Sequence, residues 1–420
     1  MHPLPTDLGE ILTALAWLPT PTYVVGGAVR DHLLGRRRST WDVDLIVEEE
    51  GLTWGSRLAK AWGGGFVALD PQRQIARVVL PNLTVDVATL VGGSLDNDLR
   101  QRDFTCNAMA MEIHDQQLRD PLNGHQDLAQ RQLRMVHPDN LSADPLRLLR
   151  GYRHTAQLGF HLTPETQAAI QERAALLSHV AGERVRAELI YMLACGQQGL
   201  EALAKADRDG VMAGWLPRLS HWPMAERMLR WYPELANLWP EASQRLDTPL
   251  ADTRPLWQVL LLLALLHDQA PAQIEQQLLA LHFSRLERQW CQKIAVTLPQ
   301  FLTLVTTQPS PEDAYDIFAK VGTALPGLLW LALGQEVMLT DLHPWMERFR
   351  DPDDPIAHAV PLLSGQEVMQ TLGIPPSPQV GSLLRQLVLA QVRREISTRS
   401  QAQTWLRAQV QQQDPLHGRG

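Results

Sequence analysis

The spacing of apolar residues changes near residue 138, and this change constrains the fold more than any other feature of the sequence. Before Val136, short β-branched runs alternate with Gly-rich or polar breaks, a pattern typical of strands joined by turns and helices. From Asp139 onward, apolar residues recur every three or four positions, as on one face of a helix. The sequence therefore predicts an α+β protein, in which a mixed sheet with flanking helices precedes an all-α remainder.

The same patterns give positions for individual elements and domains. Strands are predicted at residues 23–25, 43–47, 75–80, 83–88, 109–114 and 133–136, and helices at 6–17, 28–34, 52–62, 146–158, 165–177 and 183–194. Proline-rich breaks divide the helical part. We therefore expect four domains: a head at residues 1–138, a neck at 139–200, a body at 201–350 and a tail at 351–420.

Length and composition favour a soluble protein of several domains. The chain has 420 residues, of which 45% are apolar and 20% charged, and its net charge of -8 argues against binding nucleic acid by bulk charge. Its most apolar uninterrupted run, 259–266, is far shorter than the ~20 residues that cross a bilayer, so no membrane span is expected. The N-terminus lacks a secretory signal pattern, which predicts a cytoplasmic protein. The cysteines lie far apart, which favours reduced thiols: Cys106, Cys195 and Cys291.

A double glycine followed by paired carboxylates is the strongest local signal. Gly26 and Gly27 lie between a predicted strand and a predicted helix, where close backbone approach and free N–H groups suit a phosphate. Asp42 and Asp44 then lie two positions apart on a strand, so their side chains point to the same face. Most such pairs are solvated strand edges, but these acids begin a strand of Val, Leu and Ile. The pattern therefore favours a metal site.

A third acid, Asp86, lies between apolar neighbours on another predicted strand and is a candidate third ligand. Oxygen ligands with few protein groups favour Mg²⁺, which binds through one or two carboxylates and the phosphates of its substrate. Two such ions can activate an attacking hydroxyl and stabilise a leaving oxygen. The residues thus predict nucleotidyl transfer from a nucleoside triphosphate, with Asp42, Asp44 and Asp86 as metal-binding and catalytic residues.

Together with later motifs, these residues resemble the polymerase-β-like nucleotidyltransferases, specifically the class II branch that holds bacterial tRNA nucleotidyltransferases and poly(A) polymerases. The similar motifs lie at residues 100–108, 120–128, 144–150 and 183–188, and residues 363–383 are similar to the C-terminal segment of many members. The resemblance implies a polymerase-β-like head followed by an all-α neck, body and tail. It also implies CTP or ATP as substrates, tRNA as the acceptor, Mg²⁺ as the cofactor and pyrophosphate as a product.

The resemblance also implies nucleotide-binding residues for three parts of the substrate: Gly26, Gly27 and Arg30 for the triphosphate, Arg102, Asp103 and Asn107 for the ribose, and Asp144 and Arg147 for the base, with Arg150 and Arg153 for the triphosphate or the tRNA backbone. On a helix, residues 144 and 147 would share a face. A carboxylate and a guanidinium there match the Watson–Crick edge of cytosine, and nearly that of adenine. An ordinary ion pair between the two is the alternative.

Two departures from the family pattern bear on the product. Ala143 replaces a usual glutamate, so the base-reading aspartate lacks one supporting acid. Only about a dozen residues separate Thr89 from Arg102, whereas members that add all of CCA carry a longer flexible loop there. The short segment is what CC-adding members look like. We therefore favour CC addition over complete CCA addition, and a separate A-adding enzyme would then act on the product.

Other functions compete with this interpretation. A poly(A) polymerase of the same family is one alternative, and a catalytically inactive RNA-binding relative is another. His267 and Asp268 follow a very apolar helix and could belong to a metal-dependent phosphohydrolase site, although a helix-end pair is the better interpretation. Six tryptophans of the body could stack on RNA bases, but their irregular spacing favours helix packing.

Overall fold

The structure is a computed structural model that describes residues 7–36, 39–250 and 254–413. The chain divides into two compact units, Met1–Pro217 and Arg218–Gly420. This boundary lies inside the predicted body, and the four-domain division stays a prediction. Residue 6, at the start of the first predicted helix, lies outside the described residues.

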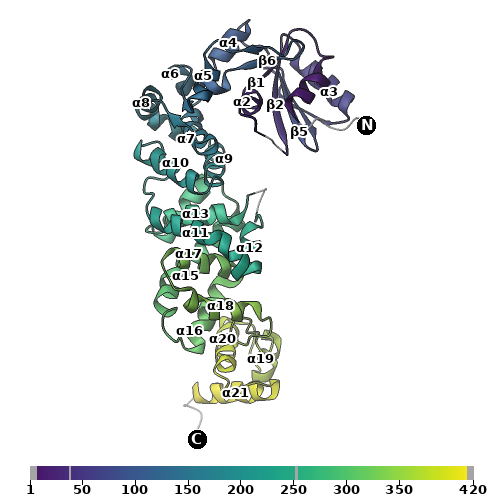
Figure 1. Cartoon of the computed structure of the whole chain (residues 1–420). Coiled ribbons are helices and arrows are strands. Elements are labelled where there is room, and N and C mark those ends of the chain that lie inside the picture. Colours follow the sequence, from purple (N-terminus) through teal and green to yellow (C-terminus); the bar gives the residue numbers. More distant parts are fainter. Residues whose placement is uncertain (1–6, 37–38, 251–253, 414–420) are drawn as a thin grey trace. The chain divides into compact units, whose positions relative to one another are not determined.

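A seven-stranded mixed sheet forms the framework of the first unit (Figure 1). Its strands lie in the order β3-β4-β5-β2-β1-β6-β7, and β2 runs parallel to β5 while the other neighbours are antiparallel. The strands are β1 (Thr22–Val25), β2 (Trp41–Val47), β3 (Gly65–Asp70), β4 (Ile75–Leu80), β5 (Leu83–Thr89), β6 (Ala110–Glu112) and β7 (Leu118–Arg119).

Strand β2 separates apolar from acidic side chains by its alternation. Trp41, Val43 and Leu45 are buried in the main hydrophobic core of the first unit, whereas Asp42 and Asp44 between them are exposed. Successive side chains of a strand point to opposite faces of the sheet. Both carboxylates therefore lie on the face that points away from this core.

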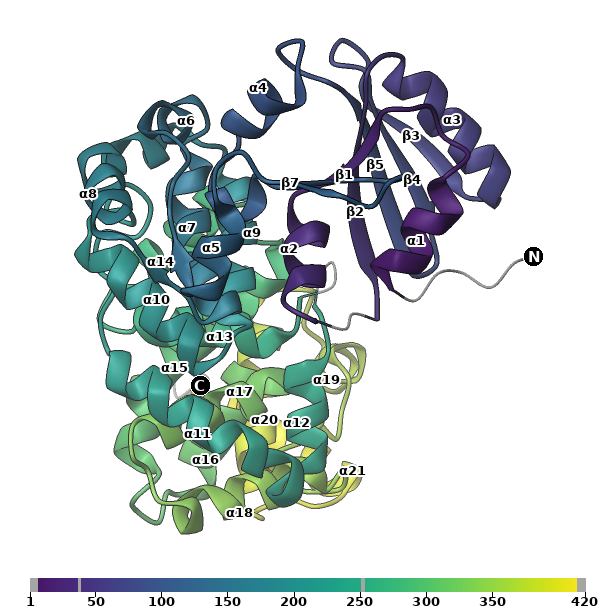
Figure 2. The ribbon, with the colours of Figure 1, turned by 45° about the horizontal axis from the view of Figure 1, so that its top comes forward.

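Three helices complete the core against the sheet (Figure 2). They are α1 (Leu8–Leu15), α2 (Gly27–Leu33) and α3 (Gly51–Trp62), close to the three helices predicted here. Leu12 of α1, Val29 of α2 and Leu58 of α3 are buried in the same core. A smaller cluster around Ile46 and Leu99 packs on the acidic face of the sheet.

Some strands differ from the expectation. The sequence does not predict β3, whose first five residues are all exposed, because a strand without a buried face has no alternating pattern. It also misses the two-residue β7. The strand expected at 133–136 is shorter, as β8 (Gln132–Leu133), and pairs with β9 (His161–Leu162). The expectation of no strand after residue 138 is wrong at β9, because two residues are too few to carry a period.

The rest of the first unit is helical, so the α+β class is confirmed. Helix α7 lies at the positions predicted for it and packs between α9 and α10. The helices are α4 (Leu95–Arg100), α5 (Gly124–Ala129), α6 (Pro138–Ala143), α7 (Leu146–Leu158), α8 (Pro164–Arg173), α9 (Gly182–Leu193) and α10 (Gln197–Arg208), with 3-10 turns at Thr105–Asn107 and Ala174–His179.

The second unit consists of helices in its described part. Two very apolar helices, α13 and α17, are buried along almost their whole length. The helices are α11 (Trp222–Leu238), α12 (Pro240–Asp247), α13 (Leu256–Leu265), α14 (Pro271–Ala280), α15 (Arg285–Leu304), α16 (Pro311–Val321), α17 (Leu325–Gly334), α18 (Leu339–Arg350), α19 (Gly365–Leu372), α20 (Pro378–Val392) and α21 (Arg399–Gln413).

The tryptophans of this helical region pack as expected. Each of the six that could have stacked on RNA is buried or half-buried: Trp215, Trp222, Trp231, Trp239, Trp257 and Trp290. His267 and Asp268 lie just after α13, where the Asp268 carboxylate pairs with His221. Among the described residues, no group of three or more His, Cys, Asp or Glu side chains is arranged to hold a metal ion. The phosphohydrolase alternative thus lacks a ligand set in this part of the chain.

One stretch of the second unit passes a simple test for a membrane span. Pro311–Gly334, which covers α16 and α17, has a mean hydropathy of 1.5 over its apolar window, and 78% of that window is buried inside the protein. The expectation of no span rested on residues 259–266 and did not consider this stretch. Core helices of soluble proteins pass the same test, so the stretch is weak support for a span.

We expect Gly199→Ala to destabilise the protein by about 1–3 kcal/mol, because the new Cβ would lie 1.9 Å from the Met192 carbonyl oxygen and α10 would have to shift. The matched change Gly381→Ala lies in α20 with nothing within 4 Å of its Cβ. It should stabilise by up to about 1 kcal/mol through helix propensity. Urea denaturation of both variants measures the difference, and equal effects would contradict the close approach of α9 and α10.

Candidate active site

The double glycine forms a tight turn between β1 and α2. Gly26 has a φ of 75°, which favours glycine, and its N–H donates to the Met109 carbonyl at 3.1 Å. A Cβ at Gly26 would lie 3.0 Å from Nη1 of Arg102 and 3.3 Å from Oδ2 of Asp44. Gly27 begins α2. The turn therefore brings backbone, a carboxylate and a guanidinium into one small space that a larger residue would disturb.

Asp42 and Asp44 form the acidic part of the site. The protein around the Asp44 carboxylate displaces part of its hydration, which raises its pKa. The carboxylates of Asp86 and Asp42 raise the pKa further, and Arg102 and Arg150 oppose them. A divalent cation between Asp42 and Asp44 would relieve this repulsion between like charges. The donor set of two carboxylate oxygen groups therefore fits Mg²⁺, with the remaining positions left to phosphate and water.

Asp86 lies beside these two acids but has another partner. In the parallel pairing of β2 with β5, Asp86 lies next to Asp44 on the same face. Both of its carboxylate oxygens accept hydrogen bonds from Arg77, each at 2.8 Å. The part of the chain that the structure describes holds no three-acid metal group. A role for Asp86 as a third ligand stays a prediction.

A cleft of about 350 Å³ lies over the acidic face of the sheet. Its wall brings together the glycine turn, the two carboxylates and several arginines. Most of the predicted site residues line it: Gly26, Gly27, Arg30, Asp42, Asp44, Arg102, Asp103, Asn107, Arg150 and Arg153. Asp86, Asp144 and Arg147 are not among the residues that line it.

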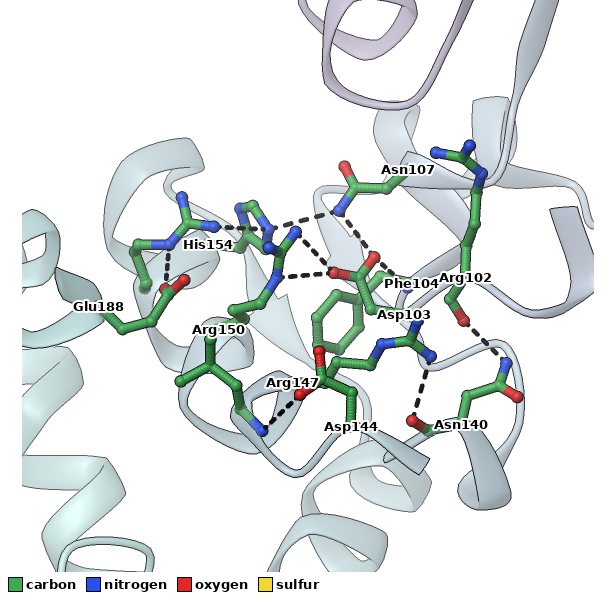
Figure 3. A network of polar contacts seen from close by, with 12 residues as sticks. Arg102, Asp103, Phe104, Asn107, Asn140, Asp144, Arg147, Arg150, His154 and Glu188 are labelled. Atoms are coloured by element: carbon green, nitrogen blue, oxygen red, sulfur yellow. Dashed lines mark hydrogen bonds and ion pairs between the residues drawn. The ribbon is translucent and has the colours of Figure 1, made fainter. Parts of the chain in front are cut away.

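Asp103 is the centre of a buried polar network in this cleft (Figure 3). Its carboxylate accepts from the Phe104 N–H at 2.8 Å, from Asn107 Nδ2 at 3.0 Å and from Arg150 Nε at 3.0 Å. Burial alone raises the pKa of this carboxyl, but Arg150 and these hydrogen bonds hold the pKa well below its usual range. Asp103 therefore stays ionised and ties the loop after α4 to helix α7.

Arg30 supports the same network from α2. Its Nη1 donates to Asn107 Oδ1 at 2.6 Å, its Nε donates to Asp31 at 3.0 Å, and the side chain is buried. The guanidinium lines the cleft, but each of its three nitrogens already contacts Asn107 or Asp31. Arg30 thus orients Asn107 in addition to the triphosphate role expected from the sequence.

The motif at residues 120–128 contacts the loop that carries Asp103 and Asn107. Asp127 accepts a hydrogen bond from the Thr105 hydroxyl at 2.6 Å, and Asp120 accepts from the Gly124 N–H at 2.8 Å. A Cβ at Gly124 would lie only 2.2 Å from the Thr105 carbonyl oxygen. The backbone of this motif therefore packs directly against the backbone of that loop.

The predicted base-reading pair is differently placed from the expectation. Asp144 has φ −135° and ψ 94° and lies between α6 and α7, so the expectation that it shares a helix face with Arg147 is wrong. Pro145 after it restricts Asp144 to extended backbone. Asp144 accepts from Arg184 at 3.1 Å, and Arg147 donates to the carbonyls of Gln101 and Asn140. Each side chain therefore has its own partner in this structure, in place of the alternative ion pair (Figure 3).

The motif at residues 183–188 contacts the site from α9. Arg184 holds Asp144, and Glu188 forms an ion pair with Arg153 of α7. Burial lowers the pKa of Arg153, although Glu188 opposes this change. These contacts hold α9 against α7 and against the segment between α6 and α7.

His154, which was not among the predicted site residues, is a buried side chain that lines the cleft beside Arg153. Its signal in the sequence is its position next to Arg153 on α7, in the polar stripe of Arg147, Arg150 and Arg153. A second cleft of about 650 Å³ shares Arg30, Asp42, Arg150 and Arg153 with the first, and it was also not predicted. It continues along α7 and α9 to Tyr191, whose side chain is 58% exposed.

The segment between β5 and residue 102 is short and folded. Five residues link β5 to α4, which Ser94 caps by accepting a hydrogen bond from the Asn97 N–H at 3.3 Å. Leu90 and Leu95 pack on the small apolar cluster of the acidic face. No long flexible loop is therefore present between Thr89 and Arg102, all of which the structure describes.

Comparisons with known proteins agree with this architecture. Residues 22–134 match the model of the poly A polymerase head domain, and residues 159–222 match that of a probable RNA- and SrmB-binding site of polymerase A. A CC-adding tRNA nucleotidyltransferase of Synechocystis sp. is 36% identical over 92% of this chain and 93% of its own length. A CC-adding enzyme of Geobacter sulfurreducens is 33% identical over 94% and 93% of the two chains.

The chain belongs to the tRNA nucleotidyltransferase family. An A-adding member from Deinococcus radiodurans is 32% identical over 92% of this chain and 95% of its own length. A solved CCA-adding enzyme with ATP has a TM-score of 0.72 at 19% identity and covers 96% of each chain, which supports the fold. Membership of this tRNA nucleotidyltransferase family makes the protein a nucleotidyltransferase and confirms the resemblance found in the sequence.

We expect Gly26→Ala to lower kcat/KM for nucleotide incorporation about 100-fold, because its Cβ would crowd Arg102 and Asp44 and strain the backbone. Steady-state incorporation into a tRNA acceptor is the measurement. Gly381→Ala, far along the chain in α20, is the control and should leave incorporation unchanged. Wild-type activity of Gly26→Ala would contradict the close approach seen at this turn.

Proposed function

We propose that this protein adds two cytidines from CTP to the 3′ end of tRNA, without a nucleic-acid template and with release of pyrophosphate. The observation that carries the proposal is the placement of Asp42 and Asp44 beside the Gly26-Gly27 turn, in a cleft whose other wall carries arginines. Such an arrangement would place a nucleoside triphosphate and the acceptor hydroxyl beside the same metal site. The names of the relatives supply tRNA as the acceptor.

Mg²⁺ is the proposed cofactor, with Asp42 and Asp44 as its protein ligands and Asp86 as a third candidate. When bound, it would lower the barrier to attack on the α-phosphate and stabilise the pyrophosphate that leaves. Asp86 would have to break its ion pair with Arg77 before it could bind a metal ion. In the state described here, its charge instead acts on Asp44 by raising its pKa.

The chain's own residues would position the nucleotide. Arg102 and Arg153 lie in the cleft where a triphosphate needs opposite charge, and the N-terminus of α2 faces the same space. Asp103 and Asn107, held by the buried network, would receive the ribose hydroxyls. Because the cleft is walled by fixed donors, the nucleotide would bind in one orientation.

Asp144 and Arg147 remain our candidates for reading the base. A nucleotide base would compete with Arg184 for the Asp144 carboxylate and with two backbone carbonyls for the Arg147 guanidinium. An exocyclic amine donates to a carboxylate, and a ring nitrogen and carbonyl accept from a guanidinium, as cytosine requires. Base reading would therefore involve rearrangement of these two side chains on binding.

The short segment after β5 supports CC addition over complete CCA addition. Only five residues lead from β5 to α4, and α4 is anchored by apolar packing, so this segment offers little freedom to switch from cytidine to adenosine. Two relatives that match along most of the chain are named as CC-adding enzymes. A separate A-adding enzyme would then complete the tRNA, and we propose the cytoplasm as the location.

The tRNA end would enter through the wider cleft next to the nucleotide site. Arg36 and Arg153 offer positive charge for phosphates there, and the exposed ring of Tyr191 offers a surface for base stacking. The wider cleft shares Asp42 with the nucleotide site, so a 3′-hydroxyl in it would lie near the carboxylates.

The decisive assay uses tRNA transcripts that end before CCA, after the first C and after CC, incubated with Mg²⁺ and with CTP, ATP or both. We expect extension to stop at CC even when both nucleotides are present. Completion to CCA would contradict CC addition, and long A-tracts would identify a poly(A) polymerase. Products are resolved to one nucleotide on a denaturing gel.

Asp42→Asn and Asp44→Asn should each reduce incorporation at least about 1000-fold, because an amide keeps the shape but loses the charge that holds Mg²⁺. Binding of tRNA should remain within about twofold, since phosphate contacts elsewhere position the acceptor. Glu201→Gln, an exposed change on α10, is the control. Full activity of both variants would contradict the assignment of Asp42 and Asp44 as metal ligands. A wild-type protein that incorporates no nucleotide but binds tRNA would favour the inactive RNA-binding relative.

A further inference from the structure

His154 is a buried histidine in the wall of the nucleotide cleft to which no role has been given so far. It lies on α7, is 3% exposed and packs edge-on against Phe104 with ring centroids 5.9 Å apart. Its polar neighbours are Asn107, proposed to hold the ribose (Figure 3), and Arg153, proposed to hold phosphate. A polar side chain buried at such a junction affects how those groups are held.

The hydrogen bonds of Asn107 fix the direction of its amide. Oδ1 of Asn107 faces Arg30 Nη1 at 2.6 Å, and a guanidinium can only donate. Nδ2 of Asn107 faces Asp103 Oδ1 at 3.0 Å, and an ionised carboxylate can only accept. The amide therefore cannot be flipped, and the second hydrogen of Nδ2 remains free to point at another acceptor.

His154 is the acceptor in reach of that hydrogen. Its Nε2 lies 3.4 Å from Asn107 Nδ2 and 3.3 Å from Arg153 Nη2, and both of these groups are donors. Nε2 must therefore be unprotonated, so the ring is neutral with its hydrogen on Nδ1. Burial, together with the charge of Arg153, lowers the pKa of His154 well below its usual value, which agrees with this geometry.

The other ring nitrogen of His154 destabilises the folded protein. Nδ1 is buried and has no hydrogen-bond partner among the described residues. An unsatisfied buried donor disfavours the folded state, so phenylalanine at this position would pack against Phe104 without that penalty. The benefit of histidine over an apolar ring therefore has to come from Nε2 and the two donors that it accepts.

We propose that His154 is a positioning residue for the sugar of the incoming nucleotide, acting through Asn107 and Arg153. Its unprotonated Nε2 holds the Asn107 amide in the plane that Asp103 and Arg30 define, and it holds the Arg153 guanidinium beside it. The ribose 2′-hydroxyl is then distinguished from a 2′-hydrogen by a rigid pair, Asp103 and Asn107. The inference rests on the proposed function, because it takes these two residues as the ribose site.

Two substitutions separate the acceptor from the ring. His154→Phe keeps an aromatic ring against Phe104 and removes the acceptor. His154→Gln offers an amide oxygen within reach of the Nε2 position and replaces the unsatisfied Nδ1–H with the N–H groups of its amide. His161→Gln, on exposed β9 of the same unit, is the matched control. Thermal unfolding of each variant shows whether it is folded before its kinetics are compared.

The measurement is the ratio of kcat/KM for CTP to that for 2′-deoxy-CTP, with tRNA lacking CCA as the acceptor. We expect His154→Phe to lower this ratio about tenfold, the size of one lost hydrogen bond, and His154→Gln to restore it to within about threefold of the wild type. His161→Gln should leave it unchanged. A wild-type ratio in folded His154→Phe would overturn the proposal, and so would a ratio in folded His154→Gln as low as in His154→Phe.

Equilibrium binding separates this inference from the proposed function. Binding of CTP and of 2′-deoxy-CTP to each purified protein with Mg²⁺, without tRNA, gives the same preference without catalysis. A wild-type protein that prefers CTP but extends no tRNA would refute the proposed function and leave the role of His154 to be judged from its binding ratios. If His154→Phe does not fold, the ratio in His154→Gln decides: a value near wild type supports the acceptor role, and a tenfold lower one overturns it.

Discussion

The alternation of side chains along β2 is the constraint on which the rest of the site depends. Trp41, Val43 and Leu45 are buried in the main core of the first unit, and this burial fixes the register of the strand. With that register fixed, Asp42 and Asp44 can only point to the opposite face. A shift of one residue would bury two carboxylates and expose three large apolar side chains, at a high cost in free energy. The hydrophobic core therefore positions the acids of the candidate active site.

The wall of the cleft opposite those acids is held together by ion pairs and hydrogen bonds between buried and half-buried side chains. Asp103 joins the loop after α4 to helix α7 through Arg150, and Asn107 extends this network to Arg30 and His154. A buried carboxylate is tolerated here because a guanidinium and two N–H donors compensate its charge. The network gives each of these side chains a fixed partner within the protein, as selection of a ligand by shape and hydrogen bonding would require. Helix α7 thus belongs to the active site as much as the sheet does.

Prediction from the sequence succeeded where a pattern was long or a motif was dense. Helix α7 has the predicted bounds, and β4 does too, because their periods extend over whole elements. The exposed strand β3 and the two-residue strand β9 were not predicted, because neither has a periodic pattern of apolar residues. Asp144 was placed on a helix from its spacing to Arg147, although Pro145 between them favours extended backbone. Contacts between residues far apart in the sequence, such as Arg184 with Asp144, left no trace in local spacing.

By itself the sequence determined the fold class, the family and most of the residues that line the cleft, because periodicity and motif order are local properties of the chain. Only the tertiary structure decided which of these residues face one another. It gave Asp144 a partner in Arg184 and brought His154 against Asn107. The physical reason is that hydrogen bonds and desolvation depend on distances across the fold, which sequence spacing along one element does not specify.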